Sequence, residues 1–145
     1  MSQFRFPLGR VLEWYQKVLQ LEENRLADCH IALSRAKRAL AEARAARLNI
    51  EQLTVRSPWV AAGDLQALEQ FRRRSLNDEK CLNAVCDASQ SKLDAQVKAV
   101  KSAQRKVRLL EKLRERRQIE HTYAANRELE QLAADTYLAK FAREQ

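Results

Sequence analysis

Leucine recurs at every seventh position in the first third of the chain, from Leu12 to Leu40. Of the five residues that lie three positions after these leucines, only Glu22 is charged. Alternating steps of three and four residues predict a helix that packs against a second helix as a coiled coil. The residues of this first seam are Leu12, Tyr15, Leu19, Glu22, Leu26, Cys29, Leu33, Ala36, Leu40 and Ala43, and Ile50 and Leu53 extend its apolar face.

The second half of the chain carries a seam of its own with the same alternating spacing. Polar residues interrupt it twice, at Ser89 and Gln96, and are expected to loosen the packing there. The residues of this second seam are Leu82, Cys86, Ser89, Leu93, Gln96, Val100, Ala103, Val107 and Leu110. Two seams in one chain predict that its two halves pair with each other.

The chain is expected to reverse direction between the seams. Pro58 disfavours helical geometry at Ser57, and Gly63 offers a left-handed position at which a helix can end. Asp64 can then cap the next helix, because its carboxylate can accept hydrogen bonds from amides two or three residues later. The segment between the two helices is therefore a turn.

The resulting prediction is an all-α fold, a long antiparallel two-helix coiled-coil hairpin that forms one domain over residues 1–145. Its parts are a first helix at 1–56, a turn at 57–63 and a long second arm at 77–143. Residues 64–76 form either a separate short helix at the tip or part of the second arm. At 1.5 Å per residue the first helix covers only part of the second, so about 20 to 30 C-terminal residues should overhang.

Composition agrees with long solvated helices and argues against an enzyme. Charged residues make up 32% of the chain and aromatic residues only 6%, as in coiled coils. The two glycines, Gly9 and Gly63, lie too far apart for a phosphate-binding loop. His30 and His121 have no nearby cysteine or carboxylate arrangement that requires a catalytic triad or a metal site. We therefore expect no catalytic residue, no cofactor and no metal.

The expected location is the cytoplasm. The N-terminus carries charged residues among its apolar ones and lacks the continuous apolar stretch of a signal peptide. No run approaches the length of a transmembrane helix. The three cysteines, Cys29, Cys81 and Cys86, are an odd number without an export signal, which indicates free thiols in a reducing compartment.

The net charge of +8 is concentrated on the outer face of the second arm, opposite the seam. This face is either a solvated surface or a binding surface for an acidic protein or for nucleic acid. Nucleic acid is the weaker reading, because no aromatic residues are interleaved for base stacking. The basic stripe consists of Lys98, Lys101, Arg105, Arg108 and Lys112.

Apolar residues exceed the needs of the seams at the tip and at the C-terminal end. Either they pack on one another, on the first helix or on a second copy, or they bind a partner in a groove or a ring. The tip residues are Trp59, Val60, Leu65, Leu68 and Phe71, and the C-terminal ones are Ile119, Tyr123, Leu129, Leu132, Tyr137, Leu138 and Phe141.

Three segments of the chain together resemble a known family. The chain opens with Phe4-Arg5-Phe6-Pro7-Leu8, which leads into Val11-Leu12 and an alanine-rich coiled coil. Its middle contains Gly63-Asp64-Leu65 with Leu68 and Phe71, and the second seam ends in Leu110-Glu111-Lys112-Leu113-Arg114-Glu115-Arg116-Arg117. Over essentially its whole length the chain is similar to the FliJ family, the stalk proteins of the bacterial flagellar type III export apparatus, which are related to the YscO-type stalk proteins of virulence secretion.

The resemblance implies a fold, a place and a set of partners. The family forms an antiparallel coiled coil like the central stalk of rotary ATP synthases. It sits in the pore of the hexameric export ATPase, which it stimulates, at the flagellar base next to the inner membrane. It contacts the cytoplasmic domain of the export gate protein and handles export chaperones. Carried onto this chain, the gate-binding residues are Leu48, Leu53, Leu65, Leu68 and Phe71, and the residues that face the ATPase ring are Leu8, Arg114, Arg117 and Tyr123.

An alternative remains at this point. A homodimeric structural coiled-coil adaptor, unrelated to secretion and with weak affinity for nucleic acid, would have much the same seams and charge. The sequence also leaves open whether an export system of this kind is flagellar or belongs to virulence secretion.

Overall fold

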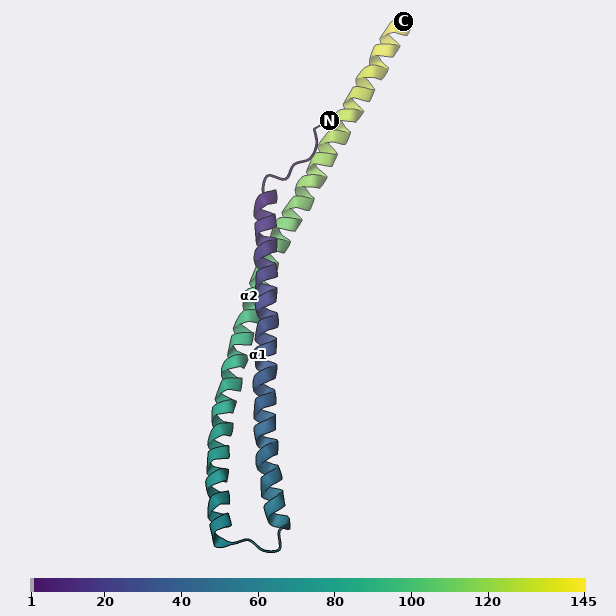
Figure 1. The fold of residues 1–145 in the computed structure, drawn as a ribbon. Coiled ribbons are helices and arrows are strands. Elements are labelled where there is room, and N and C mark those ends of the chain that lie inside the picture. Colours follow the sequence, from purple (N-terminus) through teal and green to yellow (C-terminus); the bar gives the residue numbers. More distant parts are fainter. Residues whose placement is uncertain (1) are drawn as a thin grey trace. The chain divides into compact units, whose positions relative to one another are not determined.

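The computed structural model describes residues 2–145, which form two helices joined by a short loop (Figure 1). Helix α1 spans Gly9–Arg56 and helix α2 spans Ala62–Glu144. The two helices pack against each other, so the predicted all-α helical hairpin is confirmed. The chain divides into two compact units. Unit 1 consists of Met1–Gln20 with Lys101–Gln145, and unit 2 consists of Leu21–Val100.

Helix α1 begins later than the sequence predicted. The expectation of a helix from residue 1 is wrong, because residues 2–8 are not helical and α1 starts at Gly9. Pro7 has no amide hydrogen and disfavours helical geometry in the residue before it. A turn around Pro7 leads into the helix, since the amide of Gly9 donates to Phe6 O (3.1 Å) and that of Leu12 donates to Leu8 O (2.9 Å). The predicted end of the helix, at residue 56, agrees with the structure.

Helix α2 begins earlier than the sequence predicted. It is continuous from Ala62, so residues 64–76 are its first turns and not a separate short helix. Gly63 lies inside the helix and has no positive φ, which corrects its predicted role as a left-handed stop. The amide of Leu65 donates to Ala61 O (3.1 Å), so Ala61 takes the capping position expected of Asp64. Asp64 lies in the first turn instead, where its charge suits the positive end of the helix dipole.

The core of unit 2 consists of seam residues from both helices. Ala36, Leu40 and Cys86 form a buried cluster, against which Leu82 packs. The polar interruptions of the two seams meet each other, because the Gln96 amide donates to the Glu22 carboxylate and also to Glu22 O (3.0 Å). Within unit 2, the predicted seam residues of both helices are buried or half-buried throughout.

The core of unit 1 is smaller and uses the same seams. Leu12 is only 3% exposed, and Ala103 and Val107 are 6% exposed each. The Lys106 ammonium lies over the Tyr15 ring, 5.8 Å from its centroid. The N-terminal segment reaches α2 as well, since the Phe4 ring lies 5.6 Å from the ring of His121. Towards the C-terminal end of α2 from this contact, every residue from 126 to 145 is exposed.

A polar layer interrupts the seams of unit 2 near the loop. In α1 the half-buried positions after Ala43 are Arg47, Glu51 and Thr54, so the spacing becomes four, four and three. In α2 the inward positions Phe71, Ser75, Glu79 and Leu82 repeat that spacing. An inserted step of four residues locally unwinds a coiled coil. The predicted extension of the first seam through Ile50 and Leu53 is therefore wrong, and both side chains are exposed.

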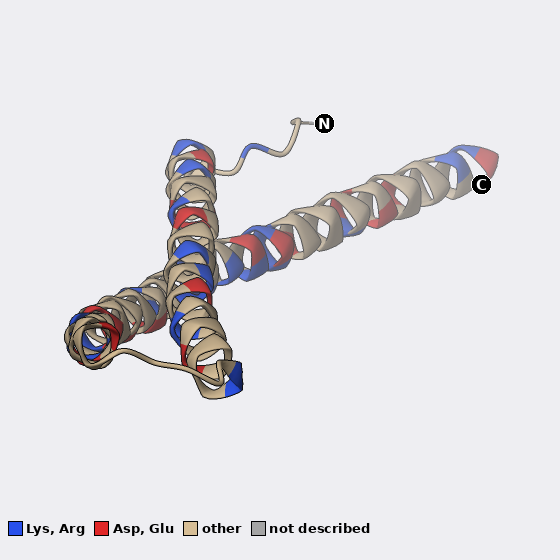
Figure 2. Cartoon of the chain, turned by 60° about the horizontal axis from the view of Figure 1, so that its bottom comes forward, with Lys and Arg blue, Asp and Glu red and all other residues tan. Residues whose placement is uncertain are grey.

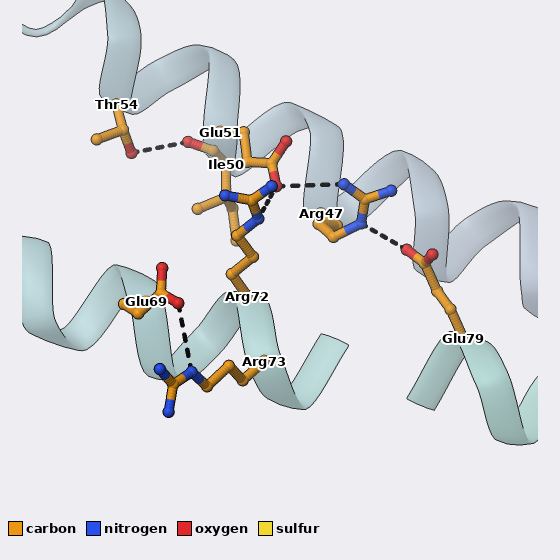
Figure 3. A network of polar contacts seen from close by, with 8 residues as sticks. All are labelled: Arg47, Ile50, Glu51, Thr54, Glu69, Arg72, Arg73 and Glu79. Carbon is orange, nitrogen blue, oxygen red and sulfur yellow. Dashed lines mark hydrogen bonds and ion pairs between the residues drawn. The ribbon is translucent and has the colours of Figure 1, made fainter. Parts of the chain in front are cut away.

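Ion pairs fill this polar layer (Figure 3). Arg47 Nε donates to Glu79 Oε1 at 2.7 Å, and Arg47 Nη1 donates to Glu51 Oε1 at 3.2 Å. Arg72 reaches the same Glu51 oxygen at 3.5 Å. The bond to Glu79, followed by the bond to Glu51, raises the pKa of Arg47 above its ordinary value, while partial burial opposes the rise. Charged side chains thus replace leucine as the link between the helices here.

Candidate functional site

The candidate sites of this chain are exposed surfaces. Within residues 2–145 no group of three or more His, Cys, Asp or Glu side chains is placed to hold a metal ion. The three cysteines are free thiols, of which Cys81 is exposed and Cys86 is buried. Over the same residues, no helix is long and apolar enough to cross a membrane.

The five residues assigned to the export gate divide into two groups. Leu48, Leu53 and Leu65 are exposed, with exposed fractions of 48%, 60% and 52%. Leu68 and Phe71 are half-buried and continue the second seam towards the loop. Phe71 follows Leu68 after three residues, and the inward position Ser75 follows Phe71 after four. The structure therefore does not bring the five together as one exposed set, because the helical repeat turns Leu68 and Phe71 towards α1.

Sequence reasoning missed one exposed apolar residue near the loop. Val55 is 85% exposed and lines an open groove of about 300 Å³ on α1 with Leu48 and Gln52. No signal in the sequence indicated it, because the seam was expected to continue through Ile50 and Leu53, and only the structure shows Thr54 as an inward position. Trp59, an expected tip residue, is 90% exposed in the loop. The Ser57 hydroxyl donates to Trp59 O at 3.1 Å and so fixes the loop backbone beside it.

The four residues assigned to the ATPase ring all belong to unit 1. Leu8 and Arg117 line one open groove of about 800 Å³. Tyr123 lines a second groove, of about 530 Å³, together with Ile119. Arg114 lines neither of them. The structure thus brings Leu8 and Arg117 together and leaves Arg114 and Tyr123 at other positions around α2.

The groove with Leu8 lies between the N-terminal segment and α2. Its apolar walls include Phe4, Phe6 and Leu113, and its charged groups include Arg117 and Glu120, which form an ion pair at 3.6 Å. Leu113 and His121 are half-buried here, whereas Arg114 and Arg117 are exposed. Such a groove suits an apolar side chain of a partner that also carries charge.

The basic stripe is exposed along its whole length. Lys98 belongs to unit 2, and the other four members belong to unit 1. No ion pair among the described residues involves any of the five. Acidic and basic residues both occur along α2 (Figure 2), and within residues 98–116 the acidic ones are Glu111 and Glu115. Arg116 follows Lys112 after four residues, is exposed, and extends the stripe by one turn that the sequence analysis missed.

Comparison of the chain with models of protein families, with curated proteins and with solved structures gave no significant match.

Proposed function

We propose that this chain is the stalk and chaperone component of a bacterial flagellar type III export apparatus. In this role it binds and stimulates the hexameric export ATPase at the inner membrane and contacts the export gate and the export chaperones. The proposal rests on the family resemblance of its three segments. One structural observation supports it, namely that these segments belong to a two-helix hairpin whose last 20 residues, 126–145, are exposed throughout.

A stalk of this kind needs no catalytic group of its own. An asymmetric rod inside a ring contacts the subunits unequally, so it can shift their conformational populations and promote assembly or turnover. Leu8, Arg114, Arg117 and Tyr123 are exposed in unit 1 and would meet the ring. The basic stripe would add attraction to acidic loops of the pore, and that part of the binding should weaken with salt.

At the gate, the exposed residues carry the proposal. Leu48, Leu53 and Leu65 would contact the cytoplasmic domain of the gate protein, and Trp59 and Val55 would join them. Large exposed apolar side chains are typical of protein-binding surfaces, and of these residues Leu48 and Val55 share one groove. Leu68 and Phe71 would support this surface from inside the hairpin.

The test is stimulation of ATP hydrolysis by the cognate export ATPase at physiological salt, with duplex DNA present as a competitor. We expect stimulation that survives the DNA and that falls when Arg114 and Tyr123 are changed to alanine. The matched control is Lys37→Ala with Arg44→Ala, two exposed basic residues on α1 outside every surface discussed above. Absence of binding, with the ATPase hexameric and both proteins folded, would contradict the proposal.

A homodimeric structural adaptor is the second candidate, and one observation favours it. Leu129 and Leu132 remain exposed at 44% and 61%, on a stretch of α2 that α1 does not cover. Two copies could bury these leucines against each other. Sedimentation at micromolar concentration separates the candidates, because an adaptor of this type is a dimer in the absence of any ATPase.

A further inference from the structure

One face of α2 in unit 1 carries a basic block followed directly by an apolar pair. The steps between its residues are four, three, four, four, three and four, which keeps all of them on one side of a helix. All seven are exposed. This docking face consists of Lys101, Arg105, Arg108, Lys112, Arg116, Ile119 and Tyr123.

The basic block of the docking face is available for a partner. None of its five cations takes part in an ion pair with the described residues. One carboxylate lies at the edge of the face, that of Glu115, which lines the groove with Ile119 and Tyr123. Leu109, which is 69% exposed, lies beside Arg105 in a shallow groove of about 310 Å³. A cationic surface with an apolar position inside it attracts acidic chains that also carry apolar residues.

The apolar pair provides an anchor at one end of the block. Ile119 and Tyr123 are 69% exposed each and share the open groove of about 530 Å³. Tyrosine at the edge of a charged surface can bury its ring and still hydrogen-bond through its hydroxyl. The docking face is therefore segregated along the helix axis, with charge over residues 101–116 and apolar contact over residues 119–123.

We infer that this face binds an acidic amphipathic segment of another protein, in which a run of carboxylates is followed by an apolar anchor. A second copy is a poorer match as the occupant, because two chains that each carry a net charge of +8 repel each other. A bilayer is a poor match, since helices that lie on membranes bury apolar residues along their whole length. Duplex DNA would engage the cations but offers nothing that buries Ile119 and Tyr123. The inference rests on the basic stripe and Tyr123, which the proposed function places against the ATPase ring, and it deepens that proposal by naming the chemistry of the partner. The peptide assay described next contains no ATPase, so its failure and a failure to stimulate the ATPase can be told apart.

Two synthetic peptides of identical composition test this inference. In one peptide the glutamates form a block that is followed by leucine and phenylalanine, and in the other the same residues are interleaved. Fluorescence anisotropy with the full chain, at physiological salt, measures the affinity for each. We expect the segregated peptide to bind about tenfold more tightly, as three to four surface ion pairs placed in register together with an anchor would give.

Variants of the chain assign the binding to the face. Arg105→Gln, Arg108→Gln and Lys112→Gln together should weaken the segregated peptide about tenfold. The control combines Lys37→Gln, Arg38→Gln and Arg44→Gln, which removes the same charge from exposed positions of α1 and should leave the affinity nearly unchanged. Ile119→Ser with Tyr123→Ser should weaken the segregated peptide and leave the interleaved one as it was. Circular dichroism checks that every variant keeps its helices.

Three results would overturn the inference. The first is equal affinity of the two peptides, and the second is an equal loss in the α2 triple variant and its α1 control. The third is tighter binding of phosphatidylserine vesicles or duplex DNA than of the segregated peptide, with the same dependence on Arg105, Arg108 and Lys112. That result would assign the face to a membrane or to nucleic acid.

Discussion

Substitution of Leu40 by alanine probes whether the seam between the helices stabilises the fold. Leu40 is 8% exposed and belongs to the buried cluster with Ala36 and Cys86, against which Leu82 packs. Leu48 lies two turns later on the same helix and is 48% exposed. The same change at both positions alters helix propensity equally, so the difference between them reports packing alone.

The size of the effect follows from the carbon atoms that lose their contacts. Leucine to alanine removes three carbons, and at about 0.8 kcal/mol per buried methylene the transfer of these atoms is worth about 2.4 kcal/mol. The cavity that remains adds to this loss. The cluster lies between only two helices, however, so neighbouring side chains can move into part of the space. We therefore expect Leu40→Ala to lower the free energy of unfolding by about 2–3 kcal/mol and Leu48→Ala by less than about 0.5 kcal/mol.

Urea unfolding followed by circular dichroism at 222 nm measures both values. The midpoint should fall for Leu40→Ala, while the slope of the transition stays the same because the area exposed on unfolding hardly changes. Equal losses at Leu40 and Leu48 would refute the assignment of Leu40 to the interior. A changed slope would indicate instead that the two helices do not unfold together.

Three further predictions concern the polar layer, the tip and the C-terminal stretch. Glu79→Gln should lower the urea midpoint, because Arg47 loses its shortest carboxylate contact. The double variant Arg47→Leu with Glu79→Leu should recover most of the loss. A Glu79→Gln variant as stable as the parent would contradict a stabilising role of this ion pair. Because the pKa of Arg47 is raised, the stabilising effect of the Arg47–Glu79 pair is fully present below the ordinary pKa of arginine and is lost only as the pH rises through the raised pKa. The difference in urea midpoint between Glu79→Gln and the parent should therefore be the same at neutral and mildly alkaline pH. Phe71→Ala should lower the free energy of unfolding by about 1–2 kcal/mol, as expected for a half-buried aromatic ring, whereas Trp59→Ala should leave it unchanged. A larger loss for Trp59→Ala than for Phe71→Ala would place Phe71 outside the interface between the helices. Removal of residues 126–145 should reduce the helical signal but leave the free energy of unfolding within about 0.5 kcal/mol of the parent value. A large loss would mean that this stretch packs against another surface.

The candidate surfaces were only partly predictable from the sequence. The basic stripe follows from residue spacing on one helix, and it needed only Arg116 to be completed. The tip set mixed exposed residues with the inward-facing Leu68 and Phe71, because their orientation depends on where α2 begins. The groove that joins Leu8 with Arg117 could not be predicted, since it depends on residues 2–8 reaching α2.

The sequence by itself determined that two helices form, where the break between them lies and, away from the polar layer near the loop, the line of side chains along which they meet. Helix formation and the seven-residue repeat are local properties of the chain, and Pro58 interrupts the helix whatever the tertiary structure is. Only the tertiary structure decided the pairing across the hairpin, such as Gln96 with Glu22 and Arg47 with Glu79. The physical reason is that sliding one helix past the other leaves each helical pattern unchanged, so register is set by the contacts between the helices.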